Sequence, residues 1–138
     1  MYYGTSSYFS RFGGETMGKL YCFELDEEKG IFFVKVGGFF KEEDAKIYLS
    51  EFQTIVNTIN PSRYKLIIDG RGQEEVASQV VDDITFVLKL YSMANFKKII
   101  IINPSSSTSR MQVENCVRNI IFPGIFVDSI EEAYSSAG

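Results

Sequence analysis

Two short segments of this 138-residue chain carry side chains that could do chemistry. The first is Asp69-Gly70-Arg71, an acid beside a base at the end of an apolar, strand-like stretch. Parallel α/β sheets place ligands at the carboxyl ends of their strands, so this pair could form a catalytic or phosphate-binding site. We favour a loop ion pair instead, because no nucleotide-binding glycine pattern surrounds these residues.

The second segment is the serine-rich run from Asn103 to Arg110. Hydroxyls and backbone N–H groups at the start of a helix can hold an anion, and Arg110 would add positive charge. The run lacks the glycine spacing and the lysine of a nucleotide P-loop, and it contains no cysteine nucleophile. We therefore favour helix capping and turn formation as the role of these hydroxyls.

The chain contains no histidine, which removes the commonest general base and the commonest transition-metal ligand. Sites of the Ser-His-Asp, Cys-His and histidine–zinc types are therefore excluded within one chain. The two cysteines, Cys22 and Cys116, lack the spacing of a metal or redox pair, which favours reduced, packed thiols. We expect no enzyme activity, no metal site and no cofactor.

The net charge of -4 and the pI near 4.9 argue against nucleic-acid binding, which depends on clustered Lys and Arg. The longest apolar run, residues 99–102, is far shorter than the roughly 20 residues that span a bilayer. No signal-peptide pattern opens the chain. We expect a cytoplasmic protein that binds neither nucleic acid nor membranes.

Residues 1–18 show neither a strand period nor a helix period, and we interpret them as an N-terminal arm rich in Gly and Ser. The arm is either a leader that ends before Met17 or a segment that packs against the domain or a partner. The second interpretation rests on aromatic side chains that are unusual in a solvated tail. These are Tyr2, Tyr3, Tyr8, Phe9 and Phe12.

Residues 19–138 are predicted to form a single α/β domain that positions the candidate sites. Residues 20–25 and 31–36 are typical of two strands of a hairpin with a polar turn between them. From Lys41 to Ile59 apolar residues recur at helical spacing, and acidic residues occupy the first turn, where the helix dipole favours them. Pro61 is expected to end this helical region.

The second half of the chain alternates strands and helices. The apolar segments 65–71 and 97–103 flank a predicted helix over residues 78–95, which indicates a parallel pair joined by a right-handed crossover. A helix capped within residues 105–108, a strand over 124–127 and a helix capped by Asp128 or Ser129 follow. The order β-β-α-β-α-β-α-β-α predicts a mixed β-sheet with helices packed on it.

The predicted helix over residues 78–95 has two apolar stripes. One stripe would face the sheet. The other contains Phe86, Leu90 and Met93 and would be covered by another element or another subunit.

From about Leu20 to Ala137 the chain resembles a STAS domain, the fold of bacterial anti-sigma-factor antagonists and of sulfate-transporter tails. The resemblance rests on four sequences, YKLIIDGRG, FVLKLY, KKIIIIN and IFPGIFVDSIEEAYSS. The last is the closest match, because the family typically ends with a Phe-Pro pair, a short strand, Asp-Ser and a Glu-Glu-Ala helix. The resemblance implies a STAS-like mixed sheet and a domain that binds another protein.

In the antagonists of this family, a partner kinase phosphorylates the first serine of an Asp-Ser-Ser-Gly motif at a helix N-terminus. That position falls on Ser78, within Ala77-Ser78-Gln79-Val80, and only the serine matches the motif. The resemblance thus implies Ser78 as a candidate phosphorylation switch. An N-cap hydroxyl is the alternative role, and we favour it.

Two functions remain open. The first is a STAS-type regulatory module that docks a protein partner through the loop from Gly70 to Gln79 and the following helix. Its candidate contact residues are Asp69, Arg71, Gln73, Phe86, Leu90 and Met93. The second is a structural subunit of a larger assembly, such as a virion or a multi-protein machine, in which the aromatic arm makes contacts and the chain could form homo-oligomers.

Overall fold

The computed structural model describes residues 20–76 and 78–138, so the five aromatic residues of the predicted arm lie outside the described residues. In these described residues, five strands and four α-helices follow one another in the order expected from the sequence, with two short 3-10 turns added. The elements are β1 (Tyr21–Asp26), β2 (Ile31–Gly38), α2 (Glu42–Val56), η1 (Pro61–Arg63), β3 (Lys65–Gln73), η2 (Ser78–Val80), α3 (Val81–Met93), β4 (Lys98–Ile102), α4 (Ser107–Val117), β5 (Ile125–Val127) and α5 (Ile130–Ala137).

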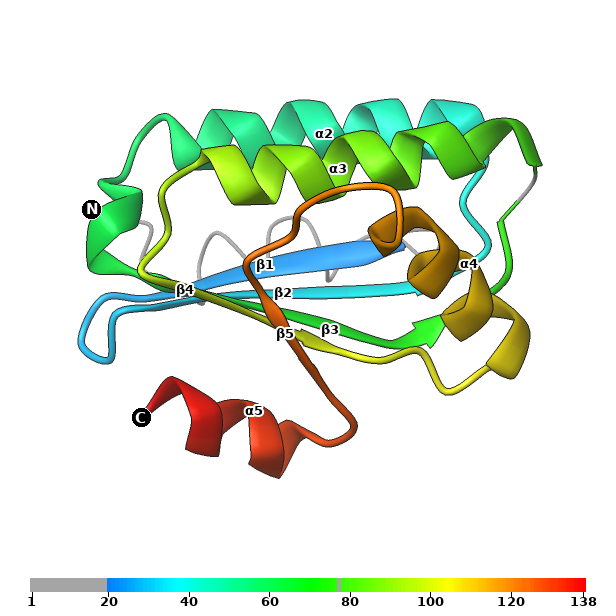
Figure 1. Cartoon of the computed structure of the whole chain (residues 1–138). Coiled ribbons are helices and arrows are strands. Elements are labelled where there is room, and N and C mark those ends of the chain that lie inside the picture. The colour runs from blue at the N-terminus through cyan, green and yellow to red at the C-terminus, as the bar shows by residue number, and fades with distance from the viewer. Residues whose placement is uncertain (1–19, 77) are drawn as a thin grey trace.

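The strands form one mixed sheet in the order β1-β2-β3-β4-β5 (Figure 1). β1 and β2 form the predicted antiparallel hairpin, whereas β2, β3, β4 and β5 are parallel to one another. The expected parallel pair is confirmed, because β3 and β4 lie side by side with Ile68 opposite Ile101. A helix joins each parallel neighbour to the next, as a crossover between parallel strands requires.

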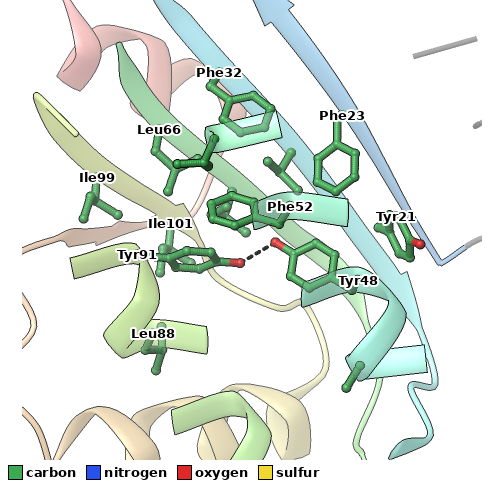
Figure 2. Close-up of a cluster of buried hydrophobic side chains, with 14 of the residues drawn as sticks. Tyr21, Phe23, Phe32, Tyr48, Phe52, Leu66, Leu88, Tyr91, Ile99 and Ile101 are labelled. Carbon is green, nitrogen blue, oxygen red and sulfur yellow. Dashed lines mark hydrogen bonds between the residues drawn. The ribbon is translucent and has the colours of Figure 1, made fainter. Parts of the chain in front are cut away.

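The two faces of the sheet are covered by different helices. α2 and α3 lie side by side on one face with α4 at their end, and α5 lies on the other face (Figure 1). The larger core lies under α2 and α3 and is rich in aromatic side chains, as Figure 2 shows. The smaller core places Ala133 and Ala137 of α5 against isoleucines of β3 and β4. Short alanine side chains let α5 approach the sheet closely.

Alternation along β3 explains why this strand is apolar on both faces. Leu66 and Ile68 belong to the core under α2 and α3, whereas Ile67 belongs to the core under α5. Successive side chains of a strand point to opposite faces, so a strand covered on both faces needs a continuous apolar run. The described helices reach at most 15 residues in α2, and none combines the length and apolar character needed to cross a bilayer.

Two helix boundaries differ from the sequence-based expectation. α2 ends at Val56, and Pro61 begins η1 instead of ending the helix. The helix expected from Ser78 begins with the 3-10 turn η2, and Val80 occupies the N-cap of α3 without a side-chain hydrogen bond. The N-cap role favoured for Ser78 is therefore wrong. Val80 is buried and anchors the start of α3 in the core, so packing replaces a capping hydroxyl at this position.

The other predicted caps are confirmed. The Ser106 hydroxyl accepts a hydrogen bond from the backbone N–H of Ser109, which starts α4. The Ser129 hydroxyl accepts one from Glu132 N–H at 3.1 Å, which starts α5. These two hydroxyls satisfy backbone donors that the first turn of a helix leaves without partners.

Candidate functional site

α4 contacts the segment from Glu74 to Val76, which follows β3 and belongs to the predicted docking loop. The Gln112 side chain accepts a hydrogen bond from Val76 N–H at 2.9 Å and donates one to the Val76 carbonyl at 3.1 Å. The buried Ser109 hydroxyl donates to the Glu74 carbonyl at 3.4 Å. Sequence reasoning missed Gln112, because its partner is 36 positions away and no local motif marks it. The predicted docking loop is therefore an ordered surface at Glu74 and Val76.

The start of this loop, at Gln73 and Glu74, is hydrogen-bonded to the end of β2. Gly38 has a φ of +82°, a conformation that favours glycine, and it ends β2. Its carbonyl accepts hydrogen bonds from Glu74 N–H at 2.9 Å and from the Gln73 side chain at 3.1 Å. The Gln73 side chain, predicted to contact a partner, thus takes part in holding the loop.

Replacing Gln112 by alanine is expected to lower the free energy of unfolding by about 1–3 kcal/mol. The backbone N–H and the backbone carbonyl of Val76 would each lose their hydrogen bond to the Gln112 side chain in a partly buried site. Urea denaturation measures this change. Gln53→Ala is the matched control, since within the described part of the chain the Gln53 side chain bonds only to the exposed Asn57. It is expected to change stability by less than about 0.5 kcal/mol. Equal stabilities of the two variants would show that Gln112 does not anchor the loop.

The outer side of α3 presents the second apolar stripe that the sequence predicted. The side chains of Phe86 and Met93 are 54% and 73% exposed, and Leu90 between them is half-buried. Met93 also borders a shallow groove between α3 and the segment that follows α4, where Ile120 and the exposed Ile121 lie. Met93 thus joins the stripe to this groove, in which Ile120 and Ile121 lie among the polar side chains of Lys89, Ser92, Arg118 and Asn119.

Charge is unevenly distributed along this surface. Near the start of α3 the chain carries Glu74, Glu75, Asp82 and Asp83, and no Lys or Arg occurs from residue 72 to residue 88. At the other end, Lys89 and Arg118 border the groove. The loop end of the surface is therefore acidic, and the groove end is basic.

Ser78 lies within the acidic end, and its side chain is exposed. A phosphate there would add nearly two negative charges to a stretch of chain that already carries four carboxylates. Because no basic side chain lies nearby in the sequence, phosphorylation would repel an acidic partner and strengthen the attraction of a basic one.

The candidate pair Asp69 and Arg71 lies apart from the apolar stripe on α3. Asp69 is only 2% exposed, and its carboxylate accepts hydrogen bonds from Arg71 N–H, Nε and Nη2 at 3.2, 2.9 and 2.8 Å. Burial opposes the ionisation of Asp69, but hydrogen bonds from the Arg71 side chain and backbone, and its charge, offset burial and lower the pKa of Asp69. The predicted loop ion pair is present.

This ion pair does not join the apolar stripe on α3. Asp69 alternates with Ile68, so it shares the sheet face of Ile67 and α5, and the charge of Glu131 at the start of α5 reaches Arg71. Of the predicted contact residues, the structure thus brings Phe86, Leu90 and Met93 together. Asp69 and Arg71 lie on the opposite face.

The polar side chains of the serine-rich segment, residues 103–110, also form ion pairs and hydrogen bonds within the chain. Arg110 pairs with Glu114 at 3.4 Å and with Asp128 at 3.2 Å, and Asp128 also accepts a hydrogen bond from Asn103 at 2.9 Å. Two carboxylates already neutralise Arg110, which weakens its attraction for an external anion. Across residues 20–76 and 78–138, no group of three or more Cys, Asp or Glu side chains is placed to hold a metal ion.

No protein-family model matches this chain, and no curated protein matches it significantly. Among solved structures, it is similar to an uncharacterized protein of the DUF3478 family from Shewanella loihica, which has a SpoIIAA-like fold. The two chains are 16% identical, with a TM-score of 0.58, and the match covers 84% of this chain and 90% of the other. The chain therefore has the SpoIIAA-like fold, that of STAS domains and anti-sigma-factor antagonists, as the sequence resemblance predicted.

Proposed function

We propose that this chain is a non-enzymatic, STAS-type module that binds a protein partner through the outer side of α3 and the loop before it. The observation that carries the proposal is the exposed stripe of Phe86, Leu90 and Met93, which is continuous with the groove at Ile121. Single exposed apolar residues are common on protein surfaces, but a contiguous apolar surface with a charged border is typical of an interaction site.

The border of the stripe suggests the chemistry of the partner. The acidic loop end favours a partner with Lys or Arg at that position, and the apolar centre favours large apolar side chains such as Leu or Phe. The anchoring of the loop by Gln112 supports this proposal, because a surface that is ordered before binding loses less conformational entropy in the complex.

The proposed contact surface is narrower than the one expected from the sequence. It keeps Ser78, Phe86, Leu90 and Met93, and it leaves out Asp69 and Arg71, which share the sheet face of α5. The charged candidates for catalysis also support a binding role. Asp69 pairs with Arg71, and Arg110 pairs with Glu114 and Asp128, so these side chains already have partners within the chain.

Met93→Glu is expected to abolish capture of the partner, because it places a charge at the centre of the apolar surface. The measurement is affinity capture from the native source, followed by titration of the captured protein against purified variants. Ile125→Glu is the control, since Ile125 is also exposed but lies on the α5 face of the sheet. A partner that binds the wild type and Ile125→Glu, with at least tenfold weaker binding to Met93→Glu, supports the proposal.

Equal binding of that partner to Met93→Glu and to Ile125→Glu would contradict the proposed surface. The same titration tests the phosphorylation switch. If Ser78→Asp leaves the affinity of the partner unchanged, regulation through Ser78 fails while docking on α3 stands.

A structural subunit of a larger assembly remains the alternative. Its main motivation, the aromatic arm, lies outside the described residues. Light scattering on the full chain and on a chain that starts at Met17 separates the alternatives, because an arm-dependent assembly would be lost in the shorter chain.

A further inference from the structure

A small cavity lies between the sheet and the helices α2 and α3, near the carboxyl ends of β3 and β4. Its volume is about 120 Å³, and its walls are mainly apolar. Ile68 and Ile101 contribute from the sheet, Ala45 from α2, and Val87 and Leu88 from α3. For comparison, an engineered apolar cavity of about 150 Å³ in another protein stays dry and binds benzene. The volume therefore suits a molecule of roughly that size.

The cavity reaches the surface below the proposed docking loop. Gln73, Asp83 and Val113, all partly exposed, form its outer edge, and Val76 and Val80 at either end of the loop also line it. Ligands of α/β proteins usually bind at the carboxyl ends of the parallel strands, and this cavity occupies that position. A small molecule thus has an entry point that does not require the core to open.

Two buried tyrosines supply a hydrogen-bond donor at the cavity. Tyr48 of α2 and Tyr91 of α3 both line it, and their hydroxyls share one hydrogen bond of 2.5 Å (Figure 2). Burial raises the pKa of both side chains, so both hydroxyls keep their protons at neutral pH. The shared bond uses one of the two protons, and among the described residues no other group accepts the second.

We propose that this cavity binds a small, neutral, largely apolar molecule that carries one hydrogen-bond acceptor, such as a cyclic ketone. The apolar walls take the hydrocarbon body, and the spare hydroxyl proton of the tyrosine pair is donated to the carbonyl oxygen of the ligand. A carboxylate is disfavoured, because its charge would have to be buried and would approach Asp83 at the entrance. This binding site is separate from the proposed protein-docking surface, although it lies directly beneath the loop.

The test is a titration of the full chain followed by amide chemical shifts. The probes are cyclohexanone, methylenecyclohexane, which has the same shape without the acceptor, and cyclopentanecarboxylate. Cyclohexanone is expected to give saturable shifts at Ala45, Gly70 and Val80, and the carboxylate is expected to bind at least tenfold more weakly. Absence of saturable shifts at these residues would overturn the proposal.

The tyrosine pair is tested with the double variant Tyr48→Phe/Tyr91→Phe, which removes both hydroxyls and keeps the rings. Cyclohexanone should bind about tenfold more weakly to it, whereas the affinity for methylenecyclohexane should change less than about twofold. An equal change for both probes would show that the hydroxyls do not contact the ligand.

The location of the site is tested by filling the cavity. Val113→Phe adds a ring at its outer edge, whereas Val117→Phe makes the same change one turn further along α4, at a half-buried residue that does not line the cavity. Cyclohexanone binding should be lost only in Val113→Phe. Ala45→Leu fills the cavity from α2 and gives the same result if Val113→Phe does not fold. Unchanged binding in a folded, filled variant would place the ligand elsewhere.

Discussion

Replacing Arg71 by alanine is expected to lower the free energy of unfolding at pH 7 by about 3 kcal/mol, because it leaves the buried carboxylate of Asp69 without its partner. Arg71 provides three of the hydrogen bonds to that carboxylate, one from its backbone and two from its guanidinium. The backbone bond at 3.2 Å survives the substitution, but the positive charge and both side-chain donors are lost.

The loss of stability should depend on pH in a defined direction. In the wild type the pKa of Asp69 lies below its ordinary value of 3.8, so the ion pair stabilises the fold above that pH and the stabilisation disappears as the pH falls through the lowered pKa. In Arg71→Ala the burial of Asp69 is uncompensated and raises its pKa, so the folded variant takes up a proton more readily than its unfolded chain. The difference between the proteins is therefore largest at neutral pH and shrinks towards pH 4 and below.

Urea denaturation at several pH values between 7 and 3.5 measures this difference. Arg110→Ala is the matched control, because Arg110 pairs, among the described residues, only with the exposed carboxylates of Glu114 and Asp128. Its removal is expected to cost less than about 1 kcal/mol at any of these pH values. If Arg71→Ala behaved like Arg110→Ala, the Asp69 carboxylate would not depend on Arg71 in the folded protein.

Replacing Phe52 by alanine is expected to destabilise the fold by about 3–5 kcal/mol, because it empties the centre of the aromatic core. Phe52 is 1% exposed, stacks on Phe32 with ring centres 5.7 Å apart, and meets the edge of Tyr91 at 5.2 Å. Figure 2 shows its ring between the strands and the two tyrosines. Thermal or urea unfolding measures the loss.

Ile47→Ala is the control for Phe52, since Ile47 lies on the same helix with 46% of its surface exposed and should cost less than about 1 kcal/mol. Equal losses for the two variants would contradict the placement of Phe52 at the centre of the core. Phe52 also lines a shallow depression between α2 and α3 with Leu90 and Met93, so its loss should loosen the proposed docking surface.

The order of the elements and most of their bounds could be predicted because they depend on local patterns. The apolar runs around Ile67 and Ile100 predicted a parallel pair of strands, and both strands were found side by side. The capping hydroxyls of Ser106 and Ser129 marked helix starts that the structure confirms. Ser78 did not follow this rule, because the buried Val80 anchors the start of α3 without a hydroxyl.

The sequence by itself determined the mixed α/β order, the apolar strands and the second apolar stripe on α3, because each follows from the spacing of neighbouring residues. Only the tertiary structure decided on which face of the sheet each residue lies and which distant residues contact one another. Because side chains alternate along β3, Asp69 lies on the α5 face, whereas its neighbour Ile68 lies under α2 and α3. The spacing of apolar residues in the sequence does not say which helix covers which face. The bond between Gln112 and Val76 and the pairing of Tyr48 with Tyr91 join residues 36 and 43 positions apart. Such contacts, and the cavity beside the tyrosines, exist only once the helices are packed on the sheet.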